Sequence, residues 1–302
     1  MPDSLPDPAA PAVPRAGHAM RVETTIAGVR AARRLFPSIG LVPTMGFLHD
    51  GHLSLIRRAR RECGAVAVSI FVNPTQFAPS EDLSRYPRDL PRDLEMLRGA
   101  GVDLVFVPEV AEMYPPGYAT GVSVSGPVAE VLEAAVRPGH FAAVATVVTK
   151  LFNIVQPDRA YFGQKDAQQA AVIRKMARDL DMPLEVVIGN TVRDPDGVAM
   201  SSRNVYLSAA DRVLAARLPA ALRAVREAFA AGERDPDQLR SLLRLQLDDP
   251  AMLIDYASIA DPDTLSELQA ADARPGMRAL ALLAVRIGRT RLIDNLRLDL
   301  PG

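Results

Sequence analysis

Short apolar segments alternate with longer segments of helical periodicity between residues 38 and 189, and this alternation constrains the fold more than any other feature. Continuous apolar runs such as Ala65–Val72 are typical of strands covered on both faces. Strands that alternate with helices indicate a parallel sheet with helices on both sides. The sequence therefore predicts an α/β fold with a doubly wound, Rossmann-like parallel sheet.

The expected ligand site of such a sheet lies beyond the carboxyl ends of its strands. The predicted strands are Ile39–Val42, Ala65–Val72, Asp103–Val107, Ala160–Phe162 and Leu184–Ile188, and the predicted helices are Val22–Phe36, Leu53–Glu62, Arg88–Gly99, Ala142–Val155 and Asp166–Leu180. Three polar segments each follow a strand, namely Pro43–His52, Asn73–Gln76 and Gly163–Asp166. We expect these three segments to converge.

A change in the pattern near residue 190 indicates a second, smaller C-terminal α+β domain over residues 191–302. It follows a first domain over residues 20–190. The predicted elements are a polar loop Thr191–Asn204, helices Ala209–Ala231 and Pro236–Leu247, a strand Met252–Ile259, and a hairpin of Ala279–Val285 with Arg289–Leu296. Residues 1–19 read as a flexible Pro/Ala-rich tail, because five of the first fourteen residues are proline.

Charge, cysteine content and hydropathy exclude several classes of protein. The 35 Lys and Arg residues against 36 Asp and Glu argue against a basic nucleic-acid binder. Cys63 is the single cysteine, so one chain can hold neither a disulfide nor a multi-cysteine metal site, and a buried structural thiol is favoured over a nucleophile. Neither a transmembrane run nor a signal peptide is evident, which predicts a cytoplasmic protein without a membrane partner.

Two histidines separated by an aspartate and a glycine precede the predicted helix Leu53–Glu62. His49 and His52 are three residues apart and therefore lie on one face of a helix N-terminus, where N–H groups favour a phosphate. Imidazoles there can donate hydrogen bonds to charge that develops on an α-phosphate. In isolation, these four residues are as consistent with one capping and one core histidine as with a phosphate site. A zinc site is less favoured, because no third ligand is nearby in sequence.

The other polar segments carry groups suited to a phosphorylated ligand and an acid. Asn73–Gln76 offers carboxamides for hydroxyl and carboxylate groups, although its composition alone favours a turn. Lys165 could contact a triphosphate or remain solvated, and Asp166 could accept from a ribose or cap a helix. Met200–Arg203 supplies two hydroxyls and a guanidinium suited to phosphate, or is a serine-rich linker.

Five motifs in register carry a resemblance to a known family. They are Pro43–Ile56 (PTMGFLHDGHLSLI), Ser69–Phe77 (SIFVNPTQF), Arg137–Phe141 (RPGHF), Tyr161–Asp166 (YFGQKD) with Gln168–Gln169, and Met200–Asn204 (MSSRN). In order and spacing they closely resemble the pantothenate synthetases of the nucleotidylyltransferase superfamily from about residue 20 onward. The resemblance implies an ATP-dependent ligase of coenzyme A biosynthesis. Such a ligase joins pantoate to β-alanine through a pantoyl adenylate and releases AMP and pyrophosphate.

The same resemblance implies a set of site residues. His52, His49, Lys165 and Arg203 would stabilise charge on the phosphates, with His52 as the principal donor. The implied ATP-binding residues are Met45, Gly46, Phe47, Leu48, His49, Asp50, Gly51, His52, Gly163, Gln164, Lys165, Asp166, Val192, Met200, Ser201, Ser202 and Arg203. Gln76 and Gln169 match the glutamines that hold pantoate, and Gln76 also lies beside the β-alanine site. Arg137 and His140 match further pocket positions.

The first domain would thus bind nucleotide and pantoate, and the C-terminal domain would cover ATP. Gln164 replaces an expected Glu, and Phe47 replaces an expected Ala. Mg²⁺ would arrive with ATP, held mainly by phosphate oxygens and with no dedicated protein metal site. Asp93 is a possible outer ligand of that ion, and Asp89 is equally consistent with the surface. Family members are usually dimeric, so we expect a homodimer.

Three other functions remain as alternatives. A nucleotidylyltransferase without an amide-forming step would have no use for Gln76 and Gln169. An aminoacyl-tRNA synthetase is disfavoured because roughly 110 residues after the first domain leave no room for an anticodon-binding domain, and because the charge is balanced. An inactive nucleotide-binding module would not need the intact histidine, lysine and Ser-Ser-Arg groups.

Overall fold

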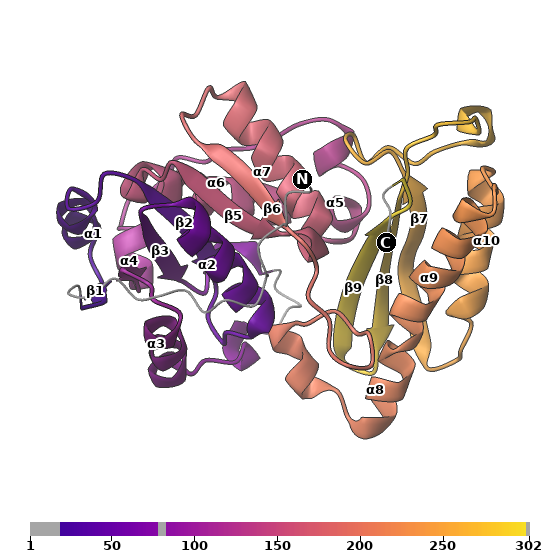
Figure 1. Cartoon of the computed structure of the whole chain (residues 1–302), viewed down its shortest axis with the longest axis horizontal. Coiled ribbons are helices and arrows are strands. Elements are labelled where there is room, and N and C mark those ends of the chain that lie inside the picture. Colours follow the sequence, from indigo (N-terminus) through magenta and orange to yellow (C-terminus); the bar gives the residue numbers. More distant parts are fainter. Residues whose placement is uncertain (1–18, 78–82, 300–302) are drawn as a thin grey trace, which may run out of the picture.

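The computed structural model describes residues 19–77 and 83–299, so the predicted tail lies almost entirely outside the described residues. The chain forms a six-stranded sheet followed by a three-stranded sheet, which lie side by side in Figure 1. The first sheet is entirely parallel and has helices on both faces, and the second is antiparallel. The predicted fold class is confirmed.

The parallel sheet has the strand order β1-β4-β3-β2-β5-β6. Its strands are β1 (Arg21–Glu23), β2 (Ile39–Thr44), β3 (Ala65–Ile70), β4 (Leu104–Phe106), β5 (Arg159–Gly163) and β6 (Glu185–Gly189). From β2 the chain adds strands first on one side and then, from β5, on the other. The strand order therefore reverses between β2 and β5, and a crevice at such a point is where these sheets bind ligands.

Helices cover both faces of the parallel sheet, as the fully buried β3 shows. The helices of this region are α1 (Ile26–Arg33), α2 (Asp50–Glu62), α3 (Leu90–Gly99), α4 (Val110–Met113), α5 (Glu133–Val136), α6 (His140–Val155) and α7 (Ala167–Asp179). Ala65 and Ala67 pack in the hydrophobic cluster of α1, α6 and α7, whereas Val66 and Val68 pack in that of α2 and α3. This alternation follows from the two-residue period of a strand.

The C-terminal sheet has the order β7-β8-β9 and is buried on both faces. Its elements are α8 (Ala209–Ala215), α9 (Arg217–Ala230), α10 (Pro236–Gln246), β7 (Met252–Ala260), β8 (Leu280–Ile287) and β9 (Thr290–Arg297). One face packs on α9 and α10, which lie on its outer side in Figure 1. On the other face, Tyr256 and Leu282 pack with Phe141 and Val172 of the first region. The two regions therefore share a hydrophobic core.

Two predicted helices differ from the observed elements. The segment Val22–Phe36 begins with strand β1, which pairs in parallel with β4, and its helix begins only after the N-cap Thr25. Tertiary pairing overrides the local periodicity here. The predicted helix Ala209–Ala231 is two helices separated at Ala216. Pro219 would interrupt one continuous helix but is tolerated in the first turn of α9.

Candidate active site

A cavity of about 220 Å³ lies at the carboxyl ends of the central strands, and we call it the histidine pocket. The three polar segments that follow β2, β3 and β5 converge there, together with the loop of residues 191–204. The predicted site residues that line it are Met45, His49, Gly51, His52, Gln76, Gly163, Lys165, Asp166, Gln169, Val192, Met200, Ser201, Ser202 and Arg203. The topology therefore places the acid-binding and phosphate-binding candidates in one cavity.

Both imidazoles are oriented by backbone N–H groups of their own helix. His52 Nδ1 accepts from the backbone N–H of His49 (3.3 Å), and His49 Nδ1 accepts from that of Gly51 (3.1 Å). A neutral imidazole that accepts at Nδ1 carries its proton at Nε2. Each ring can therefore donate an Nε2–H bond to a ligand. Gly51 is required here, because a Cβ at this position would lie 2.8 Å from the His49 ring.

The two histidines are neutral at physiological pH. Desolvation lowers the pKa of His52 to about 3, and the neighbouring His49 and Lys165 contribute to this shift. Desolvation, followed by the charge of Lys165, lowers the pKa of His49 to about 4, although the nearby acids Asp166, Asp194 and Asp50 oppose this shift. The pocket thus presents two uncharged N–H donors beside a lysine.

Asp93 holds the loop between β2 and α2 from behind. Its carboxylate accepts from the backbone N–H groups of Phe47 (2.7 Å) and Leu48 (2.8 Å), and the side chain is 1% exposed. Burial raises the pKa of Asp93, while those two hydrogen bonds lower it. The loop needs this anchor because Gly46 and Phe47 both have positive φ, 82° and 51°. Both carboxylate oxygens face the loop, which argues against the interpretation of Asp93 as an outer Mg²⁺ ligand.

Gln76 is fixed by its backbone, while its side chain lines the pocket. His140 Nδ1 and Arg137 Nη2 lie 3.0 and 3.4 Å from the Gln76 carbonyl oxygen. The Gln76 carboxamide accepts from Asn73 Nδ2 (3.2 Å) and donates to Met45 Sδ (3.2 Å). A thioether is a weak acceptor, so a polar ligand can replace it at little cost. Arg137 and His140 thus contact the pocket through Gln76.

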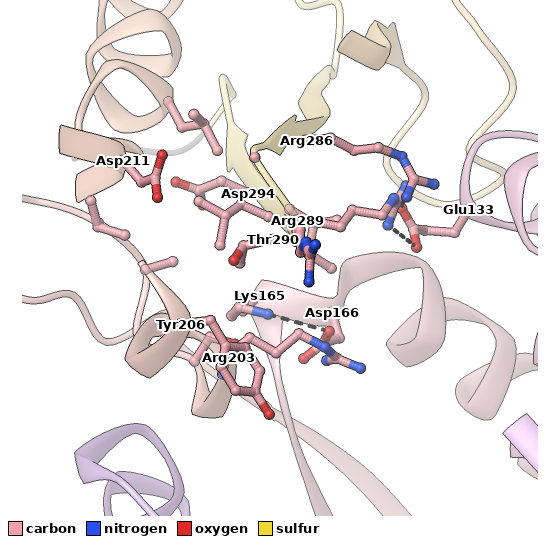
Figure 2. Close-up of a pocket in the computed structure, with 18 of the residues that line it drawn as sticks. Glu133, Lys165, Asp166, Arg203, Tyr206, Asp211, Arg286, Arg289, Thr290 and Asp294 are labelled. Carbon is pink, nitrogen blue, oxygen red and sulfur yellow. Dashed lines mark hydrogen bonds and ion pairs between the residues drawn. The ribbon is translucent and has the colours of Figure 1, made fainter. Parts of the chain in front are cut away.

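A second, wider cavity of about 890 Å³ lies between the first region and the β8–β9 hairpin, and we call it the interdomain cavity. Figure 2 shows Lys165 and Arg203 on one side and Arg289 of the hairpin turn on the other. The two cavities share Tyr86, Lys165, Asp166, Ser201 and Arg203. The Arg203 guanidinium lies 5.6 Å from the centre of the Tyr86 ring. A ligand that contacts Lys165 can therefore extend from one cavity into the other.

Asp166 differs from an ordinary capping residue. It precedes α7, yet among residues 19–77 and 83–299 its carboxylate accepts from no N–H group of that helix. Its Oδ1 atom lies 3.6 Å from Lys165 Nζ. The cap interpretation is thus not supported, and the carboxylate is available to a ligand.

Five of the predicted ATP-binding residues lie outside the lining of the histidine pocket. They are Gly46, Phe47, Leu48, Asp50 and Gln164. The Leu48 side chain belongs to the hydrophobic core, and Asp50 is exposed, 3.8 Å from Arg57. Gln164 Nε2 donates to Asn295 Oδ1 of β9 (3.0 Å). Contact with ATP stays a prediction for these five residues, as it does for the residues that line the pocket.

Sequence reasoning missed Tyr86 and an ion-pair cluster around Glu133. Tyr86 lines both cavities, and no motif indicated it. Glu133 accepts from Arg291 Nη1 (2.8 Å) and Nη2 (2.7 Å) and from the Tyr256 hydroxyl (2.9 Å). This cluster joins α5 to the C-terminal sheet. Its members are far apart in sequence, so no local signal could have revealed it.

Two other polar residues are placed away from the pocket. Cys63 is only partly buried, and its Sγ atom lies 3.3 Å from the Tyr161 hydroxyl. It is absent from the lining of both cavities, which agrees with a structural thiol. Asp89 caps α3 by accepting from the Arg92 N–H (3.1 Å).

Two features are absent from residues 19–77 and 83–299. In that part of the chain, no group of three or more His, Cys, Asp or Glu side chains is placed to hold a metal ion. Nor does any described helix combine the length and apolar character that a membrane span requires.

Comparison with known proteins finds relatives that match nearly the whole chain. Residues 19–297 match the sequence model of the family described as pantoate-beta-alanine ligase. The pantothenate synthetase of Roseiflexus sp. (strain RS-1) is 61% identical over 282 residues, which are 93% of this chain and 100% of the relative. That of Chloroflexus aurantiacus is 58% identical over 284 residues, which are 94% of this chain and 100% of the relative.

Solved structures agree. The pantothenate synthetase of Thermus thermophilus superposes with a TM-score of 0.88 at 50% identity, covering 92% of this chain and 99% of that one. The pantoate-beta-alanine ligase of Francisella tularensis, solved in complex with beta-gamma ATP and beta-alanine, has a TM-score of 0.76 at 32% identity. That match covers 94% of this chain and 99% of the other.

Proposed function

The chain belongs to the pantoate-beta-alanine ligase family, and we propose that it condenses pantoate with β-alanine through a pantoyl adenylate formed from ATP. One observation carries the proposal. Two neutral imidazoles with Nε2–H donors stand at a helix N-terminus beside Lys165, in the same pocket as the uncharged carboxamides of Gln76 and Gln169. The first group suits a phosphate and the second suits a hydroxy acid.

The first step joins the acid to the nucleotide. A carboxylate oxygen of pantoate attacks the α-phosphorus, the bond between that phosphorus and the bridging oxygen breaks, and pyrophosphate leaves. His52 and His49 donate to the α-phosphate oxygens, where negative charge grows, and Lys165 stabilises the departing phosphates. Because the donors are held by the backbone, little reorganisation accompanies the reaction.

The second step forms the amide. The amine of β-alanine, having lost its proton, attacks the acyl carbon of the adenylate, and AMP leaves with one of the original carboxylate oxygens. The mixed anhydride must be shielded from water until the amine arrives. The loop of residues 191–204 supports that role, since it lines the pocket and Ser202 Oγ donates to the carbonyl oxygen of Phe47 in the loop before α2 (3.1 Å).

Mg²⁺ would enter with ATP as part of the substrate and neutralise charge on the phosphates. Mg²⁺ bound to a nucleotide usually keeps several waters and phosphate oxygens as ligands, so we propose that the protein supplies few of them. We further propose that the protein acts as a homodimer in the cytoplasm.

Pantoate labelled with ¹⁸O in its carboxylate tests the proposal. With ATP, Mg²⁺ and β-alanine, the protein should form AMP, pyrophosphate and pantothenate in equal amounts, and each AMP should carry one label. Formation of ADP and labelled phosphate would show an acyl-phosphate ligase instead. Omitting β-alanine should abolish pantothenate formation but leave a burst of pyrophosphate, which distinguishes this ligase from a nucleotidylyltransferase.

A further inference from the structure

Two adjacent residues of β9 contact the two loops that carry Lys165 and Arg203. We propose that Asp294 and Asn295 are positioning residues that set the separation of these two cations. The inference rests on the proposed function only in assigning Lys165 and Arg203 to the phosphates of ATP. The contacts themselves lie outside the histidine pocket, whose lining includes neither residue.

Asn295 holds the backbone of the lysine loop. Its Nδ2 group donates to the carbonyl oxygens of Gln164 (2.9 Å) and Lys165 (2.9 Å), and its Oδ1 atom accepts from Gln164 Nε2 (3.0 Å). Asn295 is 4% exposed, so these three bonds are protected from water. With both carbonyl groups fixed, the direction in which the Lys165 side chain leaves the backbone is fixed as well.

Asp294 holds the other loop through Arg193. Its carboxylate accepts from Arg193 Nη1 (2.6 Å) and Nη2 (3.0 Å), and the Asp294 side chain is buried. This two-point geometry is the strongest and most directional form of an ion pair. Arg193 Nη1 also donates to the Gly197 carbonyl oxygen (3.1 Å), which closes the turn within the loop.

A short segment of chain connects Arg193 to Arg203. Arg193 pairs with Ala199 as an isolated antiparallel bridge, and the Met200 N–H donates to the Val192 carbonyl oxygen (2.9 Å). The segment Ser201–Arg203 follows this small ribbon immediately. The pair between Arg193 and Asp294 therefore contributes to the position of the ribbon, and hence of Arg203.

The geometry of a strand explains how one element can contact both loops. Successive side chains of a strand point to opposite faces, so Asp294 and Asn295 extend in opposite directions from the same two residues of backbone. β9 is also an edge strand of its sheet, and its Asn295 contacts the first region at Gln164 and Lys165. The C-terminal sheet thus acts as a spacer between the two phosphate-binding loops.

The variant Asn295→Asp distinguishes a positioning role of Asn295 from a role in stability alone. The aspartate keeps the size of the side chain and can still accept from Gln164, but it cannot donate to the two carbonyl groups. We expect the KM for ATP to rise about tenfold or more, as loss of a net 1.4 kcal/mol predicts. The KM for pantoate should stay within about threefold, because these hydrogen bonds of Asn295 hold Gln164 and Lys165, and neither Gln76 nor Gln169.

Ser258→Ala is the matched control. Ser258 is buried in the same sheet and donates to Glu267 (3.3 Å), away from both loops. It should lower the melting temperature without raising the KM for ATP. Arg193→Gln breaks the Asp294 contact from the loop side and decides the matter if Asn295→Asp does not fold. A KM for ATP that is unchanged in a folded Asn295→Asp or Arg193→Gln protein overturns the proposal.

Hydrogen exchange measured by mass spectrometry gives a readout that needs no catalysis. Relative to Ser258→Ala, the Asn295→Asp protein should exchange faster in residues 163–167, and the Arg193→Gln protein faster in residues 191–204. Unchanged exchange in both segments overturns the inference whatever the activity. If exchange rises as expected but the wild-type protein forms no AMP, the positioning contacts stand and the proposed function fails.

Discussion

The histidine pocket and the interdomain cavity hold their polar groups in different ways. In the histidine pocket the donors are neutral imidazoles fixed by backbone N–H groups at the end of a parallel sheet. In the interdomain cavity the polar groups are mainly charged side chains on loops and on the β8–β9 hairpin. The difference indicates a division of labour. Under the proposed function, the donors that meet the reacting phosphate would stand at the N-terminus of α2, and the charges that attract a polyphosphate would line the space where the two regions meet.

The two environments should also respond differently to solvent. Interactions in a desolvated pocket are strong and weakly screened, whereas salt screens exposed charges over about 10 Å at 0.1 M ionic strength. We therefore expect large, salt-independent effects of substitutions in the histidine pocket and smaller, salt-dependent effects of substitutions in the interdomain cavity.

The largest effect is expected for His52→Ala. Loss of one preorganised donor to the transition state typically lowers the rate by about 10²–10³. Adenylate formation, followed as pyrophosphate release under single-turnover conditions, should fall by that factor at both low and high salt. Pantoate binding should change little. Arg61→Ala is the control, because Arg61 is exposed near the far end of the same helix. Near wild-type turnover in His52→Ala would show that His52 serves only to cap the helix.

Arg203→Gln should have a smaller effect that depends on salt. A hydrogen bond to a charged group is worth about 1.5–3 kcal/mol, which corresponds to roughly 10–100-fold in ATP affinity. Calorimetric titration of ATP should show this ratio between wild type and variant at about 0.05 M salt and a smaller one at about 0.5 M. Arg244→Gln, an exposed substitution on α10, controls for net charge. A ratio that does not change with salt would mean that Arg203 acts in a desolvated site.

Gln76→Ala and Gln169→Ala should separate acid binding from nucleotide binding. Each leaves a buried polar group of pantoate unpaired, at a typical cost of about 1–3 kcal/mol. Pantoate affinity should therefore fall about tenfold or more, while ATP affinity without pantoate should hold within roughly threefold. Titration of each ligand into each variant measures both quantities. Loss of ATP binding with intact pantoate binding would show that pantoate binds at the other end of the pocket, away from Gln76 and Gln169.

The smallest effect concerns pH and activity. With pKa values of about 3 for His52 and about 4 for His49, both imidazoles stay neutral from pH 8 to pH 5. The turnover number should thus show no titration near the ordinary histidine pKa of about 6.5. A decline of kcat with an apparent pKa near 6.5 in this range would show that one of these imidazoles keeps the pKa of a solvated histidine.

Stability should nevertheless depend on pH. In the unfolded chain the histidines bind protons below about pH 6.5, whereas in the folded protein they do so only below about pH 4 and 3. The unfolded state binds more protons in this window, so stability decreases as pH falls through it, by about 2 kcal/mol per histidine at pH 5. Urea denaturation at pH 7 and pH 5 should show a smaller loss in His49→Asn than in the wild type. An equal loss would assign the acid sensitivity to other groups.

The sequence predicted the histidine pocket better than the interdomain cavity, for a physical reason. Parallel strands bring their carboxyl ends to one edge, so local motifs such as Pro43–His52 and Gly163–Asp166 could be placed in one crevice without knowing any distance. The tautomers of His49 and His52 could not be read in this way, because they depend on hydrogen-bond geometry.

The interdomain cavity depends on contacts between distant segments. Glu133 meets Arg291 across 158 residues, and Gln164 meets Asn295 across 131. No periodicity or motif encodes such a meeting. Gln164 is an example. The sequence indicated only that it replaces an expected Glu in the predicted ATP loop, whereas in the structure its side chain donates a hydrogen bond to Asn295 of β9. Strand β1 was missed because its pairing with β4, and not its own composition, makes it a strand.

The shared hydrophobic contact beneath the C-terminal sheet has a consequence for how this chain can be divided. A fragment that ends near residue 190 would keep every strand of the parallel sheet but would expose Phe141 and Val172, which Tyr256 and Leu282 now cover. Such a fragment would expose an apolar patch and would be prone to associate through it. The first region is therefore not an exchangeable module, and gene fusions or truncations that treat residue 190 as a border would cut through a shared hydrophobic core.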